Sequence, residues 1–383
     1  MSLQSVCWFR VCSYRLIAFY CLLLSGCGAA PEAENKPEIW RFAIEEAEGG
    51  VQHKYATRFK ELIEERSGGE IEVIIYPYGT LGTSTHITEQ LNLGVIDFAM
   101  ASPGSLGKLI PELQVFNLHF VLPVDERLTQ RILGDQELIE EFDQLYQPKG
   151  LKLLSIFSEG EMVWTTNQEI RSPEDFAGVK FRVMTSPLLL ASYDAYGASA
   201  TPMPYSEVYS GLQLKQIDGQ VNPVFAIERQ KFHEVTSWMT FPGHASFITT
   251  CATNLDFYNA LSADRKTLLN QVIRELDEYI FEVQRGFQTE RLKSILKDAK
   301  RRQRMMHISG DLVRFMESLS KEEHKELIEE NEYVEFLPVL STEEREVFRN
   351  ASKEARELFL EIGGSRSREF LERLQSAAKT YEE

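Results

Sequence analysis

Residues 177–183 read AGVKFRV, and three more segments follow in order: GASATPMPYSEVY at 197–209, IDGQVNP at 217–223 and QKFHEV at 230–235. The first segment predicts a strand over Lys180–Met184, which carries Arg182. A helix over Leu188–Tyr196 follows and ends at Gly197, a residue type that readily takes the left-handed conformation after a helix. Another helix is predicted over Tyr205–Lys215. This alternation of strands and helices predicts an α/β unit with a mostly parallel sheet.

The rest of the body repeats this pattern. Strands are predicted at Ile39–Ile44, Ile71–Tyr76, Val95–Met100 and Leu151–Phe157, and helices at Val51–Arg66 and from the turn at 79–82 to Leu93. Because the pattern restarts near Leu151, we expect two α/β domains: residues 39–157 and residues 158–245, each completed by part of 246–383. A helical pattern from Ser262 to about Arg304 has scarcely a breaker and is long for a globular helix. Ser320 and Ser341 are typical of further helix starts.

The composition is that of an acidic globular protein. The 383 residues include 41 Lys and Arg against 58 Asp and Glu, a net charge of −17, and 43% are apolar. This length allows two or three domains of ordinary size. The acidic balance argues against a nucleic-acid binder, which needs a basic face to neutralise phosphates. It also argues against a polybasic protein of the membrane surface.

The first 26 residues predict an export signal. Arg10 and Arg15 come before the apolar run 16–24, which is too short to span a bilayer and is typical of a secretory signal peptide. A buried N-terminal helix and a mitochondrial-type leader are the alternatives. The run ends Leu24-Ser25-Gly26-Cys27, which resembles the bacterial lipobox, so Cys27 is expected to carry a lipid anchor. A plain secreted protein with an incidental cysteine is the other interpretation. Residues 27–38 are then a flexible tether.

Motifs that carry enzyme chemistry are mostly missing. There is no Gly-x-Ser-x-Gly, no His-Glu-x-x-His and no Gly-x-Gly-x-x-Gly pattern. The seven histidines are scattered, and Cys251 is the one cysteine outside the predicted leader and anchor. This leaves no metal-ligand spacing and no internal disulfide. We therefore expect no catalytic residue, no cofactor and no metal.

The four segments quoted above resemble the solute-binding proteins of tripartite ATP-independent periplasmic (TRAP) transporters, the DctP-type family. Earlier segments agree with this resemblance: Tyr76-Pro77, Leu81-Gly82, LGVIDF at 93–98 and PELQVF at 111–116. It implies a two-domain α/β clamshell of the periplasmic-binding-protein kind, with mixed sheets, a long bracing helix and a helical C-terminal extension. It also implies a small organic acid as ligand, integral membrane subunits of a TRAP transporter as partners, and a location in the periplasm or cell envelope.

The resemblance assigns three ligand-binding residues. Arg182 lies in the position of the family's carboxylate anchor, and a guanidinium grips a carboxylate with two charge-assisted hydrogen bonds. Asn222 lies in the position of the family's Asn before a proline and would bind the ligand's carboxylate or hydroxyl. Tyr205 would wall the pocket. Without a ligand role, Arg182 would be a surface ion-pair partner, Asn222 a turn residue and Tyr205 a core aromatic.

Several departures from the family pattern bear on the ligand. Met162 replaces the second arginine of sialic-acid-type members, and Ser102 replaces an acid. Val221 and His119 replace a glutamate and a proline. Glu45 lies where a neutral polar residue is common, although it could also be plain surface among neighbouring acids. Together these departures argue against sialic acid and favour a smaller monocarboxylate, with a hydroxyl or amino group if Glu45 lines the pocket.

Three other functions remain open at this point. A binding module that feeds an envelope sensor or chemoreceptor would have the same pocket. An envelope hydrolase would need a nucleophile–base pair, and the sequence shows only unpaired Ser and His. A structural lipoprotein would bind no small molecule. The region from about 297 to 340 is extended relative to simpler members, as an oligomerisation element or the edge of a lid would be.

Overall fold

The first of two sheets has five strands and draws on distant parts of the chain. The computed structural model describes residues 36–382. The strands are β1 (Glu38–Ala43), β2 (Ile71–Tyr76), β3 (Phe98–Ala101), β4 (Leu151–Glu161) and β10 (Ser246–Asn254), in the order β2-β1-β3-β10-β4. β1 and β3 are parallel, whereas β10 is antiparallel to both β3 and β4. The sheet is therefore mixed, and the strand that makes it so is β10.

Helices cover both faces of this sheet. They are α1 (Val51–Arg66), α2 (Ser84–Asn92), α3 (Pro103–Leu106), η1 (Pro111–Asn117), α4 (Glu126–Leu133), α5 (Gln136–Tyr146), η2 (Gln147–Lys149) and α9 (Leu255–Ala260). α1 buries Tyr55, Phe59, Leu62 and Ile63 at helical spacing, as the sequence predicts. Phe59 packs with Trp40 and Phe42 of β1 and with Phe98 of β3 in an aromatic core.

The second sheet has seven strands. They are β5 (Val163–Thr166), β6 (Lys180–Val183), β7 (Ser199–Pro202), β8 (Gly219–Asn222), β9 (Trp238–Thr240), β11 (Met306–Ser309) and β12 (Val334–Leu337), in the order β12-β11-β9-β5-β8-β6-β7. β5 runs antiparallel to β8 and β9, and the other neighbours are parallel. The extended region 297–340 thus contributes β11 and β12 to this sheet.

Short helices surround the second sheet. They are η3 (Pro173–Phe176), α6 (Pro187–Asp194), η4 (Tyr205–Glu207), α7 (Val208–Gln213), α8 (Val224–Arg229) and η5 (Phe232–Glu234). Ser172 caps η3 in a capping box with Asp175. The helix predicted over 205–215 is wrong in one respect: it is split into a 3-10 turn, η4, and a short α-helix, α7.

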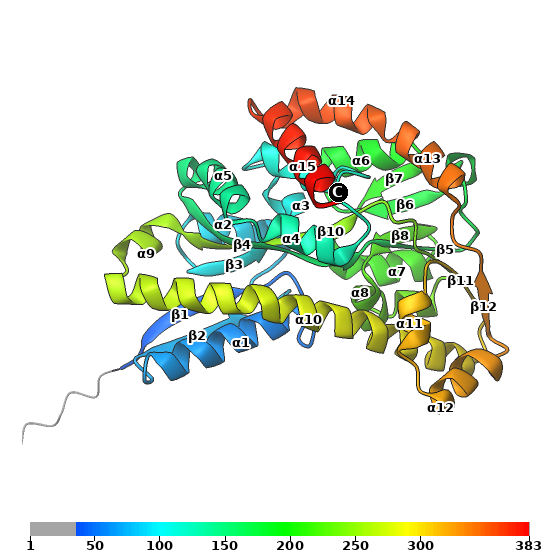
Figure 1. Cartoon of the computed structure of the whole chain (residues 1–383), viewed down its shortest axis with the longest axis horizontal. Coiled ribbons are helices and arrows are strands. Elements are labelled where there is room, and N and C mark those ends of the chain that lie inside the picture. Colours follow the sequence, from blue (N-terminus) through cyan, green and yellow to red (C-terminus); the bar gives the residue numbers. More distant parts are fainter. Residues whose placement is uncertain (1–35, 383) are drawn as a thin grey trace, which may run out of the picture. The chain divides into compact units, whose positions relative to one another are not determined.

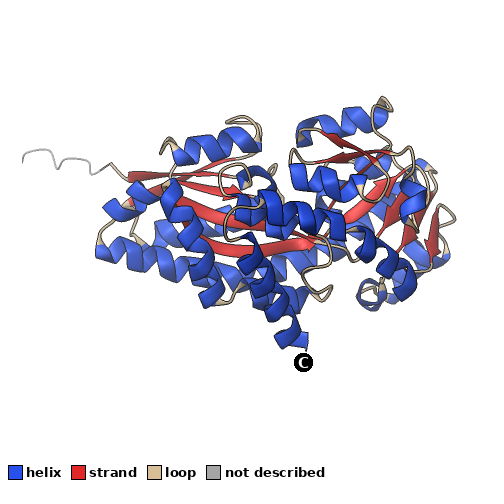
Figure 2. Cartoon of the chain, turned by 90° about the horizontal axis from the view of Figure 1, so that it is seen from above, coloured by secondary structure: helices blue, strands red, loops and turns tan. Residues whose placement is uncertain are grey.

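Three segments join the two sheets. The first is Met162, which lies between β4 and β5, and the second is residues 241–245, which lie between β9 and β10. The third is α10 (Ala263–Arg302), which contacts β4 and α1 on the side of the first sheet and α8 and β12 on the side of the second (Figure 1). We call Met162 and residues 241–245 the crossing. Seen from above, the two groups of strands lie side by side along the chain's long axis (Figure 2).

The long helix predicted from Ser262 is confirmed. Ser262 caps α10, which runs for 40 residues and buries one stripe that includes Leu269, Leu276, Leu292 and Leu296. Residues 39–383 group as one compact unit, and β4 continues through the expected domain boundary at 157–158. The division into two domains therefore stays a prediction.

The C-terminal region is helical, as expected. It holds α11 (Val313–Glu317), α12 (Lys321–His324), the π-turn η6 (Lys325–Glu329), α13 (Thr342–Ala351), α14 (Lys353–Ile362) and α15 (Ser367–Glu382). α14 contacts α6, and α15 contacts α4, so the last helices lie on both groups of elements. Cys251 is a free thiol buried in β10.

The predicted leader, Cys27 and most of the tether lie outside the described residues. Among the residues that the structure describes, no helix combines the length and apolarity needed to cross a membrane.

Candidate ligand-binding site

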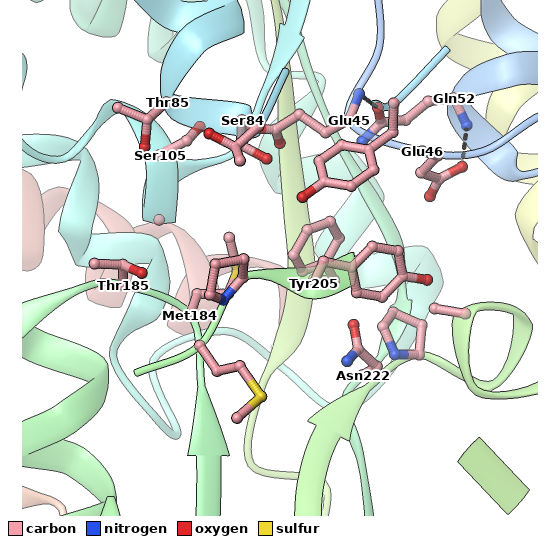
Figure 3. A pocket seen from close by; sticks show the side chains of 18 of the residues that line it. Glu45, Glu46, Gln52, Ser84, Thr85, Ser105, Met184, Thr185, Tyr205 and Asn222 are labelled. Atoms are coloured by element: carbon pink, nitrogen blue, oxygen red, sulfur yellow. Dashed lines mark hydrogen bonds between the residues drawn. The ribbon is translucent and has the colours of Figure 1, made fainter. Parts of the chain in front are cut away.

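The site lies where strands of both sheets end. Glu45 follows β1, Tyr78 follows β2, Ser105 follows β3, Met184 follows β6, and Asn222 ends β8. They line one cavity of about 130 Å³. In Figure 3 Glu45, Ser84 and Ser105 lie on one side of it, and Met184, Tyr205 and Asn222 lie on the other. The ends of strands in α/β sheets commonly form such sites, because the loops there carry side chains into a shared crevice.

One side of the pocket is acidic, and its carboxyl groups are largely held by the protein itself. Glu45 is 7% exposed, its Oε2 accepts the backbone N–H of Ser102 at 2.8 Å, and its own N–H donates to Gln52 Oε1 at 2.7 Å. Glu45 Oε1 has no hydrogen-bond partner among the described residues. Burial raises the pKa of Glu45, and the neighbouring polar groups of Ser105, Ser102 and Ser84 oppose this rise. Glu45 therefore presents one unsatisfied oxygen in the pocket wall.

Behind Glu45, two more carboxyl groups lie together. Glu46 Oε2 accepts the N–H of Gln52 at 2.9 Å, and Glu159 Oε1 accepts Gln52 Nε2 at 2.9 Å. Burial raises the pKa of Glu46 well above its ordinary value, and the charge of Glu159 raises it further. Burial also raises the pKa of Glu159. Two buried carboxyl groups in contact cannot both ionise at low cost, so each favours the protonated form of the other.

The other side of the pocket carries a buried cation. Arg182 of β6 is 2% exposed, and its Nε and Nη2 donate to the backbone oxygen of Met203 at 3.0 and 2.8 Å. No carboxylate of the described residues forms an ion pair with it. Burial lowers the pKa of Arg182 to about 10, so the guanidinium remains charged at neutral pH. A buried, charged and unpaired arginine is costly unless a ligand supplies the anion.

Asn222 and Tyr205 flank Arg182. Asn222 is 7% exposed and donates its amide N–H to Gln220 Oε1, and Gln220 in turn donates to Thr165 at 2.8 Å. This chain fixes the amide orientation. The ring of Tyr205 contacts Tyr78 edge-on at 5.9 Å and Phe232 at 6.0 Å. Burial raises the pKa of Tyr205, so its hydroxyl stays neutral.

Ser102 and Met162 lie elsewhere. Both line a second, smaller cavity of about 30 Å³ beside the crossing, together with His119 and Val221. Ser102 still acts on the ligand pocket, because its backbone N–H binds Glu45. Burial lowers the pKa of His119 to about 3, so this histidine is neutral and its Nδ1 is 2.6 Å from the hydroxyl of Tyr196.

Sequence reasoning missed several pocket residues: Glu46, Gln52, Tyr78, Ser84, Thr85, Ser105, Phe225 and Phe247. Part of this set could have been predicted from the sequence. Tyr78 directly follows a predicted strand, and Ser84 and Thr85 begin the helix after the turn at 79–82, which is the edge where α/β proteins bind ligands. Phe247 had no such signal, because it lies on β10, whose pairing with β3 and β4 is a long-range event.

A metal centre is not indicated by the described residues. His233, Glu234 and Asp298 have ligand atoms within 4.8 Å of one another. However, Arg302 forms ion pairs with Glu234 at 2.6 Å and with Asp298 at 2.7 Å, so a cation already satisfies these carboxylates. No His, Lys or Cys lines the ligand pocket. Its polar groups can bind and orient an ion, but they include none of the usual nucleophile–base pairs.

Comparisons with known proteins agree with this geometry. Residues 42–331 match the model of the bacterial extracellular solute-binding protein family 7, DctP. The chain is 42% identical over 277 residues to the ectoine/5-hydroxyectoine-binding periplasmic protein UehA of Ruegeria pomeroyi, which covers 72% of this chain and 81% of that protein. It is 40% identical over 274 residues to the ectoine-binding periplasmic protein TeaA of Halomonas elongata, covering 71% and 79%.

The fold is similar to solved structures. The ectoine-binding protein of the TeaABC TRAP transporter of Halomonas elongata superposes with a TM-score of 0.77 at 34% identity, over 90% of this chain and all of that one. A TRAP periplasmic solute-binding protein of Marinobacter aquaeolei superposes with a TM-score of 0.74 at 36% identity, over 88% and 99%. The predicted α/β clamshell class is confirmed by these structures. The chain belongs to the bacterial extracellular solute-binding protein family 7 and is a solute-binding protein of the TRAP transporter type.

Proposed function

We propose that this protein captures a small zwitterionic carboxylate of the ectoine kind outside the cytoplasm and delivers it to the membrane subunits of a TRAP transporter. The ligand's carboxylate binds Arg182, and its cationic or hydrogen-bond-donating end faces Glu45. Binding and release are the whole of its activity, and no substrate is converted.

The main support for the proposal is that each side of the pocket has one group that the described residues leave unsatisfied: a charged guanidinium without an acid on one side and a carboxyl oxygen without a donor on the other. Within residues 36–382, Arg182 is buried without an acidic partner, and Glu45 is buried with one oxygen unsatisfied. A plain monocarboxylate would satisfy only the arginine. A zwitterion satisfies both sides, and charge-assisted hydrogen bonds to both ends are stronger than neutral ones. The names of the two relatives described above, which are ectoine-binding proteins, support the same ligand class.

Closure of the pocket follows from where its two sides originate. Glu45 follows β1 of the five-stranded sheet, whereas Arg182 and Asn222 lie on β6 and β8 of the seven-stranded sheet. The two sheets are linked by the crossing and by α10. A ligand that bridges both sides favours the arrangement in which they are close, which is the physical basis of hinge closure. The long-range field of an acidic chain repels anions, so affinity comes from these local contacts.

The proposed location is the periplasmic side of a bacterial membrane. The relatives that match are periplasmic proteins by name. The signal peptide and the lipid anchor on Cys27 remain proposals from the sequence. Mass spectrometry of the protein isolated from a bacterial membrane fraction tests the anchor: a diacylated Cys27 at the N-terminus supports it, and an unmodified or unprocessed chain contradicts it.

A thermal-shift panel tests the ligand. The panel contains ectoine, 5-hydroxyectoine, succinate and galactonate, and ectoine is expected to raise the melting temperature most. A ligand present at 100 times its dissociation constant stabilises the folded state by about 2.7 kcal/mol. Isothermal titration calorimetry then ranks the affinities. Stronger binding of succinate than of ectoine would overturn the zwitterion assignment, and a lack of binding by all four would overturn capture of this ligand class.

A further inference from the structure

A basic cavity lies beside the crossing, away from the ligand pocket. Its volume is about 300 Å³, and it is lined by residues 120–124, by Gly243 and by the last helices. Four cationic side chains line it: Arg345, Arg349, Arg356 and Lys379. No Asp or Glu is among the described residues of its lining. In a chain with a net charge of −17, four cations around one cavity are unusual, because like charges held together repel one another.

Two of these arginines are fixed by the backbone around the crossing. Arg345 Nη2 donates to the oxygen of Gly243 at 3.0 Å. Arg356 Nη2 donates to the oxygens of His119 and Phe120 at 3.2 and 3.3 Å. The guanidinium of Arg349 lies over the ring of Phe120, 5.1 Å from its centre. The three guanidinium groups are therefore held in place before any ion binds, which reduces the cost of ordering them.

The same arginines have unused hydrogen-bonding capacity. Arg345 Nε and Arg356 Nε are buried and have no partner among the described residues. The pKa of Arg345 is lowered by burial and by the charge of Arg349, and the pKa of Arg356 is lowered by the same two causes. The nearby acids act from outside the cavity: Glu346 pairs with Arg349 at 3.2 Å, and Glu161 attracts Arg345. A buried donor without an acceptor is destabilising.

We propose that this cavity is a binding site for a small oxyanion such as phosphate, sulfate or a carboxylate. Such an ion accepts several N–H bonds at once and removes the repulsion among the four cations. Arg345 and Arg356 already donate to the backbone of Gly243 and of residues 119–120. An oxyanion bound by the four cations would therefore connect α13, α14 and α15 to the crossing. All four cations lie beyond residue 331, where the family match ends, so the site depends on a segment that the shared family model does not describe.

The test uses thermal melting of the full exported chain without ligand, at constant ionic strength. Phosphate, sulfate and citrate are compared with chloride, and an oxyanion is expected to raise the melting temperature by roughly 2–4 °C. The order of the three anions distinguishes a phosphate-like from a carboxylate-like site. A wild-type protein that responds to none of them overturns the proposal.

Variants locate the effect. Among the described residues, Arg349 and Lys379 donate no hydrogen bond to the backbone, and Arg349 is 45% exposed. The double variant Arg349→Gln, Lys379→Gln is therefore expected to fold and to lose most of the shift. Arg368→Gln is the matched control, since Arg368 is an exposed cation of α15 outside the cavity and should keep the full shift. Equal responses of these two proteins contradict the site. Loss of the response in Arg182→Ala instead would place the anion in the ligand pocket and also contradict it.

Discussion

The two sides of the ligand pocket differ in how the protein compensates their buried ionisable groups. On the acidic side, Gln52 donates to both Glu46 and Glu159, and burial together with the charge of Glu159 raises the pKa of Glu46, which favours its neutral form. On the opposite side, the backbone oxygen of Met203 is the only acceptor that the described residues offer to Arg182. The acidic side is thus largely complete without a ligand, whereas the basic side is not. From this difference we expect Arg182 to supply most of the binding energy and Glu45 to select among carboxylates.

The largest effect is expected from removing the guanidinium. Arg182→Ala should weaken binding of ectoine by about 100-fold or more, since the loss of one partner of a buried ion pair costs about 3–5 kcal/mol. The melting temperature of the ligand-free protein should stay within a few degrees of wild type, because Arg182 has no acidic partner among the described residues. Calorimetry and thermal melting measure the two quantities.

Arg182→Lys is the matched control for this variant. It keeps the charge but loses the planar fork, so it should bind with an affinity between those of wild type and Arg182→Ala. A fall of much more than a few degrees in the melting temperature of the ligand-free Arg182→Ala protein would mean that Arg182 is structural. The comparison of the two sides of the pocket would then fail.

A smaller effect is expected on the acidic side. Glu45→Gln keeps an acceptor for the N–H of Ser102 but removes the charge. The preference for ectoine over galactonate should fall by about tenfold, because roughly 1.4 kcal/mol of charge-assisted binding is lost. Glu48→Gln is the control: Glu48 is exposed on the same loop and outside the pocket. An unchanged preference in Glu45→Gln would show that Glu45 does not face the ligand.

The smallest effect is expected on stability. The folded state raises the pKa values of Glu46 and Glu159, so it binds protons more tightly than the unfolded chain does. The stabilising contribution is present below the ordinary pKa of 4.5 and is lost as the pH rises through the raised pKa values. Glutamine does not ionise, so Glu159→Gln avoids the cost of ionising a buried carboxyl group at high pH. The variant should therefore melt about 2–4 °C above wild type at pH 8.

The same variant should show no such gain at pH 4, where the wild-type pair is protonated. Melting curves at both pH values, recorded without ligand, provide the check. A variant that is destabilised equally at both would mean that Glu159 stabilises through its hydrogen bonds alone, and that no proton is retained by the pair.

Local signals predicted much of the fold. The β-branched run 71–76 gave β2 with its observed bounds, and Ser262 marked the start of α10 within one residue. The strand at 151 was expected to end at Phe157, but β4 continues to Glu161, because pairing with β10 extends it. Likewise, the strand expected from Val95 begins at Phe98, after a turn that follows Gly94. What the sequence misses is the placement of β10, since it pairs with two strands that are distant along the chain, β3 and β4.

In the candidate site, too, local sequence signals predict some residues, and long-range contacts determine the others. Arg182, Asn222, Tyr205 and Glu45 line one pocket, as the motif resemblance implies, and their roles there stay predictions. The sequence gives no signal that distinguishes Glu46 from the neighbouring acids of its loop. Its burial depends on Gln52 and on Glu159, which is 113 residues further along the chain. Networks of this kind are assembled by tertiary contacts, and residue type alone does not reveal them.

The buried thiol of β10 has a practical consequence for spectroscopy. Burial raises the pKa of Cys251, and its side chain is inaccessible, so it is a poor nucleophile toward maleimide labels. A chain that starts at residue 36 contains no other cysteine. Pairs of engineered surface cysteines, one near each sheet, can therefore carry fluorophores for distance measurements during ligand binding, with the native residue left in place.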